Sequence, residues 1–538
     1  MAATVEARTR TAASERRRWT DKVVDALFAP MDIAILVYFR AVFGILVIWR
    51  AILEVRTHVI SELIHANILF TFWPFTFVKR MPATFMYGVE VLLVVAGAFM
   101  VLGLYYRASA IVIFAAETYL FLLDEGHYLN HIYLLCLVAF LMIFVPANRR
   151  WSVDTRFDPS LRRDEVPAWT IWLLRFQIAV VYFFGGIAKL NTEWFRGEPL
   201  RTVLLNHRNF PLLGHFFSNH LFFDFLNWGT LLLDLLVVFA LLNRYTRVPA
   251  YMAVIVFHLM NARFFNIDIF PWMMIASTAI FFPADWPRRL VNDARTSPRP
   301  RRFWRFVVGF VVVAALALYI PTRHAPIDPL LGGIGGGVVG YFFEIPRRRT
   351  ERRALAPTAR STRQRLVAGL LAAWVVVQLL VPLRHFLTPG NVLWTEHGER
   401  FSWYMMLRNK SGSTTFVVRD PLTGRTTEVR PADFLTPTQL VRFTGDPDLI
   451  VQFAHYLSAK AQRDLHLTVR PQVFAHTDIS LDLGPRQVFV DPNVDLARIQ
   501  RPLSGRQTWI LPMRPLGSGS HEAPSDSDLN KSASNSAG

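Results

Sequence analysis

Separate runs of apolar residues, many of them roughly 17–20 residues long, constrain the fold of this chain more than any other feature. Runs of this length can cross the hydrocarbon core of a bilayer as helices, and a hydrophobic fraction of 52% agrees with that reading. The sequence therefore predicts a polytopic α-helical membrane protein with about 9–11 spans. The predicted spans are 33–53, 84–104, 108–123, 129–146, 169–188, 226–242, 248–260, 267–283, 303–320, 331–344 and 365–383. The glycine-rich run 331–344 is short for a span, and we expect it to pair with 303–320 as a hairpin.

The formal charge of +18 comes largely from arginines in the short loops between these apolar runs. In a soluble protein such a charge would indicate nucleic-acid binding, but here orientation in the membrane explains it better. Arginines precede the first span, follow the fourth, sixth and eighth, and at 347–353 precede the last, so they share one side if every span crosses. The positive-inside rule makes that side cytoplasmic. The single cysteine, Cys136, excludes a disulfide framework, and no cleavable signal peptide is evident.

Hydrophobicity falls after the last predicted span. Alternating runs at 414–420 and 487–491, separated by turn sequences, predict a small domain of mainly β or α+β structure. An odd number of spans and an inside N-terminus place this domain outside the cytoplasm. The predicted organisation is a basic cytoplasmic N-terminus (1–30), a transmembrane domain (31–383), an extracytoplasmic domain (384–515) and a disordered tail (516–538).

Four groups of polar residues fall at the outer ends of the predicted spans. Ionisable residues in a membrane are costly and are by default candidates for function, although a polar rim that faces water is the alternative. His258 and Asn261 are three residues apart, so they share one helix face. The groups are Asp124–His127 with Asn130 and His131, Lys189 with Glu193, His258 and Asn261 with Asp268, and Trp394–Gly398.

Lys189 stands where a long apolar run leaves the hydrocarbon, one turn after Gly185 and Gly186, which allow a ligand or another backbone to come close. A snorkelling lysine at a helix end is the ordinary explanation. Alternatively, desolvation at the edge of a low-dielectric site favours the neutral amine, which can act as a general base. The chain contains no HExxH, CxxC or Walker motif, so we expect no metal site.

Short motifs follow one another in order over about residues 30–515. They are Asn130-His131-Ile-Tyr-Leu, Pro146-Ala-Asn-Arg-Arg-Trp-Ser-Val-Asp154, Val181-Tyr-Phe-Phe-Gly-Gly-Ile-Ala-Lys-Leu190 with Trp194, Leu231-Leu-Leu-Asp234, Phe257-His-Leu-Met-Asn261, Asp285-Trp-Pro-Arg288, His385-Phe-Leu-Thr-Pro-Gly390, Trp394-Thr and Phe401-Ser-Trp-Tyr-Met-Met406. As an ordered set they resemble the vitamin K-dependent γ-glutamyl carboxylase family, in its short bacterial form. The membrane portion of that family is also called the horizontally transferred transmembrane domain.

The resemblance implies roles for individual residues. Lys189 corresponds to the base that deprotonates reduced vitamin K, and His131, with its neighbour Asn130, corresponds to the histidine beside the reaction. Tyr182 lies two helical turns before Lys189 and faces the same way. The resemblance also implies residues that bind the quinone, and these are Tyr182, His258, Asn261, Phe270, Met405 and Met406. The residues that it implies for binding the substrate are Trp394 and Trp403.

The resemblance also implies the reaction. Members of the family convert a protein-bound glutamate to γ-carboxyglutamate, and couple this to conversion of reduced vitamin K to its epoxide. The implied cofactor is a phylloquinone or menaquinone hydroquinone, with carbon dioxide and dioxygen as co-substrates and no metal. The implied partners are the lipid bilayer and a glutamate-containing protein or peptide, and the implied location is the bacterial plasma membrane.

Some positions depart from the family pattern. The family motif often has two adjacent lysines, whereas here the first position is Ala188 and only Lys189 remains. The stretch before Ser402 is more polar, with Glu399 and Arg400. Two alternatives stay open: a quinone-linked membrane oxidoreductase that does not carboxylate protein, and a non-enzymatic polytopic membrane or transport protein.

Overall fold

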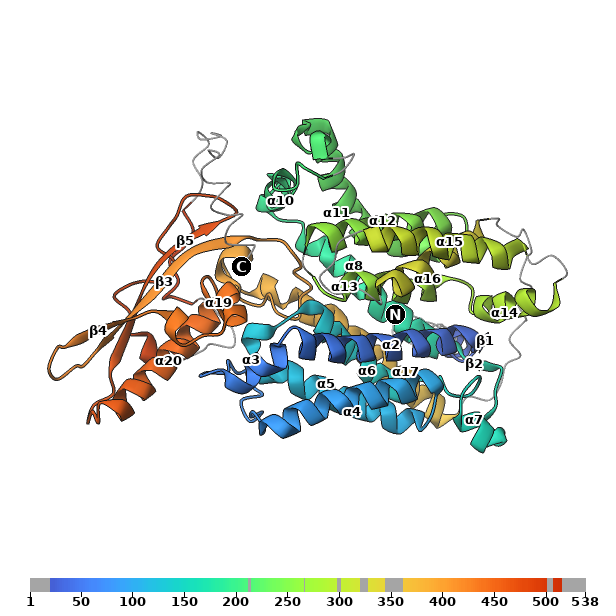
Figure 1. Ribbon diagram of the computed structural model, residues 1–538, viewed down its shortest axis with the longest axis horizontal. Helices are drawn as coiled ribbons and strands as arrows, with labels where there is room; N and C mark the ends of the chain where they lie inside the picture. Colours follow the sequence, from blue (N-terminus) through green and yellow to red (C-terminus); the bar gives the residue numbers. More distant parts are fainter. Residues whose placement is uncertain are drawn as a thin grey trace, which may run out of the picture.

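The computed structural model describes residues 20–210, 214–265, 267–297, 301–319, 328–343, 361–500 and 507–514. A bundle of long helices makes up most of the molecule, and a smaller domain built on three strands lies at one end of the bundle (Figure 1). The expectations for residues before 20, for the arginines at 347–353 and for the tail after 514 lie outside the described residues.

Every predicted span coincides with a helix, and the prediction of a polytopic helical membrane protein is confirmed. In the described part, six helices are long and apolar enough to cross a membrane: α2, α4, α5, α8, α11 and α17. The bundle helices are α2 (Ala34–Arg56), α4 (Ala83–Leu102), α5 (Tyr106–Leu123), α6 (Asn130–Phe144), α8 (Ala168–Ala188), α11 (His220–Leu242), α12 (Arg247–Phe264), α13 (Phe270–Thr278) continued by η4 (Ala279–Phe281), α15 (Arg301–Tyr319), α16 (Asp328–Phe342) and α17 (Thr362–Leu383).

Shorter elements connect and cover these helices. A two-stranded antiparallel ribbon pairs β1 with β2 at the end of the bundle opposite the C-terminal domain (Figure 1). The shorter elements are β1 (Pro30–Asp32), α3 (Val59–His65), η1 (Glu125–His127), α7 (Asp154–Phe157), η2 (Pro159–Leu161), β2 (Glu165–Pro167), α9 (Thr192–Phe195), α10 (Leu200–Leu205), η3 (Gly214–Ser218), α14 (Trp286–Thr296), η5 (Arg384–Leu387) and α18 (Val392–Thr395).

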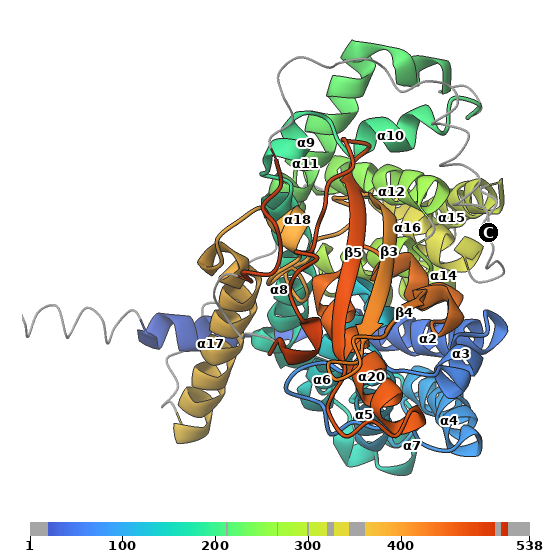
Figure 2. The same cartoon turned by 90° about the vertical axis from the view of Figure 1, so that its left-hand side faces the viewer.

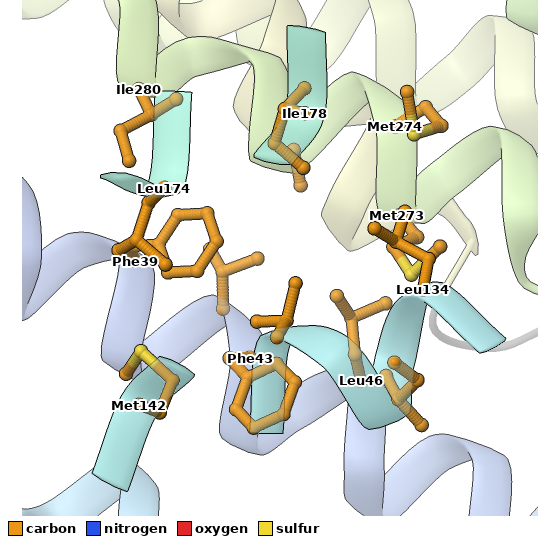
Figure 3. Packing of buried hydrophobic residues seen from close by; sticks show 14 of the residues in the cluster. Phe39, Phe43, Leu46, Leu134, Met142, Leu174, Ile178, Met273, Met274 and Ile280 are labelled. Carbon is orange, nitrogen blue, oxygen red and sulfur yellow. The ribbon is translucent and has the colours of Figure 1, made fainter. Parts of the chain in front are cut away.

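Helices α2 and α8 form the centre of the bundle because their side chains are apolar around most of the helix. Phe39 and Phe43 of α2 meet Leu174 and Ile178 of α8 in a core that also takes in α6 and α13 (Figure 3). Helix α17 stands at the side of the bundle instead (Figure 2), with only 11% of its apolar window buried. Two hydrogen bonds of 3.2 Å hold it there, since Gln177 of α8 bonds both Trp374 and Gln378.

The motif from Pro146 to Asp154 fastens the bundle at the end opposite the C-terminal domain. The guanidinium of Arg40, only 2% exposed, donates at 2.8 Å to the carbonyl oxygens of Ala147 and Trp151. Asp154 accepts the backbone N–H of Tyr105 at 2.8 Å and so satisfies a free donor at the start of α5. This family-like motif is therefore structural here.

The C-terminal domain is an antiparallel sheet in the order β4-β3-β5, with α20 packed on one face. Strand β3 pairs with β5 from Lys410 opposite Leu481 to Arg419 opposite Gln472. The elements are β3 (Lys410–Arg419), β4 (Thr426–Val429), η6 (Pro431–Asp433), α19 (Pro437–Phe443), α20 (Pro447–Asp464), β5 (Gln472–Leu481) and η7 (Leu496–Arg498). The alternating run at 487–491 forms only isolated bridges, because two of its N–H groups donate to the Thr477 hydroxyl.

Candidate active site

A cavity of about 450 Å³ lies where the helix bundle meets the C-terminal domain, and we call it the seam cavity. Its inner half is lined by the ends of α6, α8, α12 and α13 and by the middle of α11. Its outer half is lined by Glu396, Glu399 and residues 404–410, and by the end of α19 with the residues that follow. Neither domain encloses it alone, and its volume falls in the usual range for a small-molecule site.

Buried polar contacts fix the C-terminal domain over the bundle at η1. Gln439 of α19 donates to Asp124 at 2.8 Å, and Gln452 of α20 donates to Glu125 at 2.9 Å. Arg400 forms an ion pair with Glu125 at 3.3 Å. Because η1 leads directly into α6, these contacts set the position of the outer half of the cavity relative to the inner half. The polar group predicted at Asp124–His127 thus joins the domains and does not line the cavity.

Lys189 lies at the end of α8 and lines the inner half of the seam cavity. Its Nζ forms an ion pair with Asp234 of α11 and sits 5.2 Å from the ring centroid of Trp194. A Cβ added to Gly185 would lie 3.3 Å from Met405, so this glycine lets the Met405 side chain pack closely against α8. The buried amine is held by a carboxylate and faces the cavity, unlike a snorkelling lysine, whose head lies in water.

His131 and Asn130 begin α6 on another wall of the cavity. Asn130 donates to the carbonyl oxygen of Tyr404 at 2.7 Å and accepts from the Tyr128 hydroxyl at 2.9 Å, which ties α6 to the 396–410 segment. The His131 ring is 5% exposed, and its Nε2 finds no hydrogen-bond partner among the described residues. A buried nitrogen without a partner is costly, and a bound ligand with a hydroxyl or carbonyl would satisfy it.

Tyr182, His258 and Phe270 bring polar and flat apolar groups together in the inner half. The Tyr182 hydroxyl lies 3.1 Å from His258 Nε2 and 2.9 Å from the Thr278 hydroxyl. The Phe270 ring centroid lies 6.1 Å from that of His131 and 5.8 Å from that of His258. Asn261, Met405 and Met406 also line the cavity. A flat ring with oxygen atoms at its edges fits such a lining, where aromatic and thioether surfaces lie beside ring nitrogens.

The outer half of the cavity carries paired charges. Arg408 contacts Glu396 at 2.7 Å and also Glu399, and Lys410 donates to Glu396 at 2.8 Å. Burial alone would raise the pKa of the Glu396 carboxyl, but Arg408 and Lys410 hold that pKa below its ordinary value. Arg442 of α19 is exposed to the cavity and, among the described residues, has no carboxylate within ion-pair distance. It is therefore the lining cation most able to receive an anionic group.

The segment that runs from Glu396 to Met406 between the two halves has an unusual backbone. Glu396, Phe401, Trp403 and Met406 all have positive φ, between 52° and 64°. Non-glycine residues rarely adopt this conformation, and such strain gathers where a side chain must be aimed at a site. In this segment the unusual backbone conformation turns the side chains of Glu396, Tyr404 and Met405 toward the cavity.

The structure brings most of the predicted site residues into one cavity. Two do not reach it: Trp394 and Trp403, the predicted substrate-binding residues, are 1% and 0% exposed and do not line the cavity. Trp394 donates to the Leu511 carbonyl at 2.8 Å inside the C-terminal domain, and Trp403 packs 5.2 Å from the Tyr133 ring. An indole that fills a core is not available to a peptide. The predicted residues that line the cavity are Asn130, His131, Tyr182, Lys189, His258, Asn261, Phe270, Met405 and Met406.

Sequence reasoning missed several lining residues. Asp234 stands in a motif that the sequence showed, but its pairing with Lys189 depends on how α8 and α11 pack. Arg408 and Arg442 had no signal that separates them from the rest of the 58 lysines and arginines of the chain. The described residues contain no cluster of His, Cys, Asp and Glu suited to a metal ion.

Two family models match the chain. The HTTM domain matches residues 28–286, and the vitamin K-dependent gamma-carboxylase lumenal domain matches residues 363–515. Together they cover the helices and the C-terminal domain that enclose the seam cavity, and they leave α15 and α16 between them. No solved structure matches the chain. With both domains matched in the order that the sequence motifs indicate, the chain belongs to the vitamin K-dependent γ-glutamyl carboxylase family.

Proposed function

We propose that this protein is a vitamin K-dependent glutamyl carboxylase, which converts a glutamate of a protein or peptide to γ-carboxyglutamate. The observation that carries the proposal is that Lys189 and His131 share one cavity with Arg442. A base, an imidazole nitrogen with no partner among the described residues, and an anion-binding group therefore lie together. Membership of the family supports the same activity. The inner half binds the quinone, and the outer half receives the glutamate.

The lining fits a reduced naphthoquinone. His131 Nε2 and the Tyr182–His258 pair offer hydrogen bonds to its two ring oxygens, and Phe270 with Met405 covers its faces. When bound, this group supplies, through its oxidation by dioxygen, the energy to remove a proton that no protein side chain is basic enough to take. The protein itself positions the quinone and the glutamate, excludes water from the cavity and provides one proton acceptor.

Lys189 accepts a proton at Nζ when its amine is neutral. The ion pair between Lys189 and Asp234 is the state that results, in which the carboxylate stabilises the ammonium. Their contact keeps Nζ aimed at the cavity, and the low dielectric of the helix ends strengthens the pairing. Arg442 holds the γ-carboxylate of the incoming glutamate, while the pairing of Arg408 with Glu396 and Glu399 leaves those side chains neutralised.

The orientation that we propose places the N-terminus and the arginine-rich loops in the cytoplasm of a bacterial cell, and the C-terminal domain outside its plasma membrane. Thr192, at the same end of the bundle as the C-terminal domain, is exposed. A cysteine at Thr192 should react with an impermeant maleimide added outside intact cells. The native Cys136 is buried and gives little background. Reaction only after lysis would contradict the orientation.

The activity is tested with purified protein in liposomes, reduced vitamin K, ¹⁴C-bicarbonate and a glutamate peptide. We expect label in the peptide together with vitamin K epoxide. Lys189→Ala and Lys189→Arg should both lose about 10²–10⁴-fold in rate, since arginine cannot give up its proton. The exposed Lys79→Ala is the matched control and should stay active. Absence of both products would refute the proposal, and epoxide without label would favour a quinone-linked oxidoreductase.

Asp234→Asn keeps the shape of the side chain but removes the carboxylate from Lys189. We expect kcat to fall about a hundredfold with KM for the peptide unchanged, because the ammonium loses its partner while the outer half stays intact. Asp224→Asn lies on the same helix with an exposed side chain and serves as control. Equal rates for Asp234→Asn and the parent protein would remove Asp234 from the proposed machinery.

Arg442→Gln tests the outer half. Loss of one charge-assisted contact should raise KM for the glutamate peptide about 10–100-fold and leave kcat nearly unchanged. Arg430→Gln, in the same domain and 73% exposed, should change neither constant. If Arg442→Gln lowers kcat alone, the carboxylate is held elsewhere.

A further inference from the structure

A second hollow lies on the lipid-facing side of the bundle, away from the seam cavity. It has a volume of about 940 Å³ and runs between α12, α15 and α16, and we call it the hairpin groove. Helices α15 and α16 fall between the two family matches, so one wall of this groove is a feature of this chain and not of the matched domains.

Glycines give the groove its depth. A Cβ added to Gly309 would lie 2.1 Å from the carbonyl oxygen of Gly336, and one added to Gly340 would lie 2.1 Å from that of Arg305. The two helices of the hairpin therefore touch backbone to backbone, as small residues permit in membranes. Because Gly309, Gly336 and Gly340 have no side chains, the groove is deep where these residues line it.

The walls are apolar and face outward. Val308 and Val312 of α15 are 61% and 52% exposed, and Val256 of α12 is 61% exposed. The lining of α15 extends from Arg301 to Leu316, which is about 22 Å at the helical rise. That length exceeds the roughly 15 Å of hydrocarbon in one leaflet, so an entire acyl chain can lie along the groove.

One end of the groove is cationic. Arg301, Trp304 and Arg305 line it where α15 begins, next to α14 and at the end of the bundle away from the C-terminal domain (Figure 1). A tryptophan with arginines at a helix end marks the headgroup level of a bilayer. Two guanidinium groups at the mouth of an apolar groove complement a phosphate that carries an acyl chain.

We propose that the hairpin groove is a binding site for an anionic glycerophospholipid, whose phosphate contacts Arg301 and Arg305 and whose acyl chain lies on Gly309 and Val312. Basic pockets between membrane helices recognise such headgroups. The isoprenoid tail of a quinone would fill the same groove but carries no charge for the arginines. The lipid packs on the face of α12 that carries Ile255 and Leu259, behind His258, and its binding is independent of the proposed reaction.

The test is native mass spectrometry of the full-length protein released from nanodiscs that contain equal amounts of phosphatidylglycerol and phosphatidylcholine. We expect phosphatidylglycerol to stay bound preferentially. Retention should fall about fivefold in Arg301→Gln and about twenty-five-fold in the double variant with Arg305→Gln, from the usual contribution of one basic residue. Val312→Trp fills the groove, keeps both arginines and should also release the lipid.

Arg162→Gln with Arg163→Gln is the matched control, since both arginines are exposed at the same end of the bundle but lie outside the groove. This control should retain as much phosphatidylglycerol as the parent protein. Three outcomes would overturn the proposal. The two lipids could be retained equally, the control could lose as much lipid as the groove variants, or Val312→Trp could displace a quinone in place of phospholipid. None of these readouts depends on carboxylase activity, so failure here leaves the proposed function untouched.

Discussion

The attachment of the C-terminal domain to η1 is the contact on which the candidate site depends. Arg400 reaches both Glu125 of the bundle, at 3.3 Å, and Asp446 of its own domain, at 2.5 Å. Buried charges of this kind tolerate little displacement, because a broken pair leaves an uncompensated ion in a medium of low dielectric. The two halves of the seam cavity are therefore held in one geometry, although each half belongs to a different domain.

The same electrostatic rule explains the lining of the cavity. Lys189 with Asp234, and Arg408 with Glu396, pair charges that would otherwise be too costly to bury. Once those pairs are made, His131 Nε2 is left without a partner among the described residues, and Arg442 is left without a carboxylate. These are two lining groups that the proposed ligand and substrate would complete.

Glycine serves two distinct purposes in the bundle. At Gly185 it lets the side chains of Met405 and Asp234 come close to α8, and at Gly309 and Gly336 it brings two helices into backbone contact. The first is part of the matched HTTM domain, whereas the second belongs to the hairpin that lies between the matches. The hairpin thus forms one wall of the hairpin groove, and none of its described residues lines the seam cavity.

The amino-acid sequence predicts those features of this protein that depend on local composition. The length and hydropathy of the apolar runs predicted every bundle helix, because a segment's solubility in a bilayer does not depend on its neighbours. The motifs around His131 and Lys189 also indicated the family before any geometry was known.

The packing of the elements against one another decided the rest of the structure. Trp394 and Trp403 stand in the right motifs but fill hydrophobic cores, and Asp234 meets Lys189 only because α11 lies against α8. Which face of an element points inward, and which charge finds a partner, depends on contacts between residues far apart in the chain, and those exist only in the folded protein.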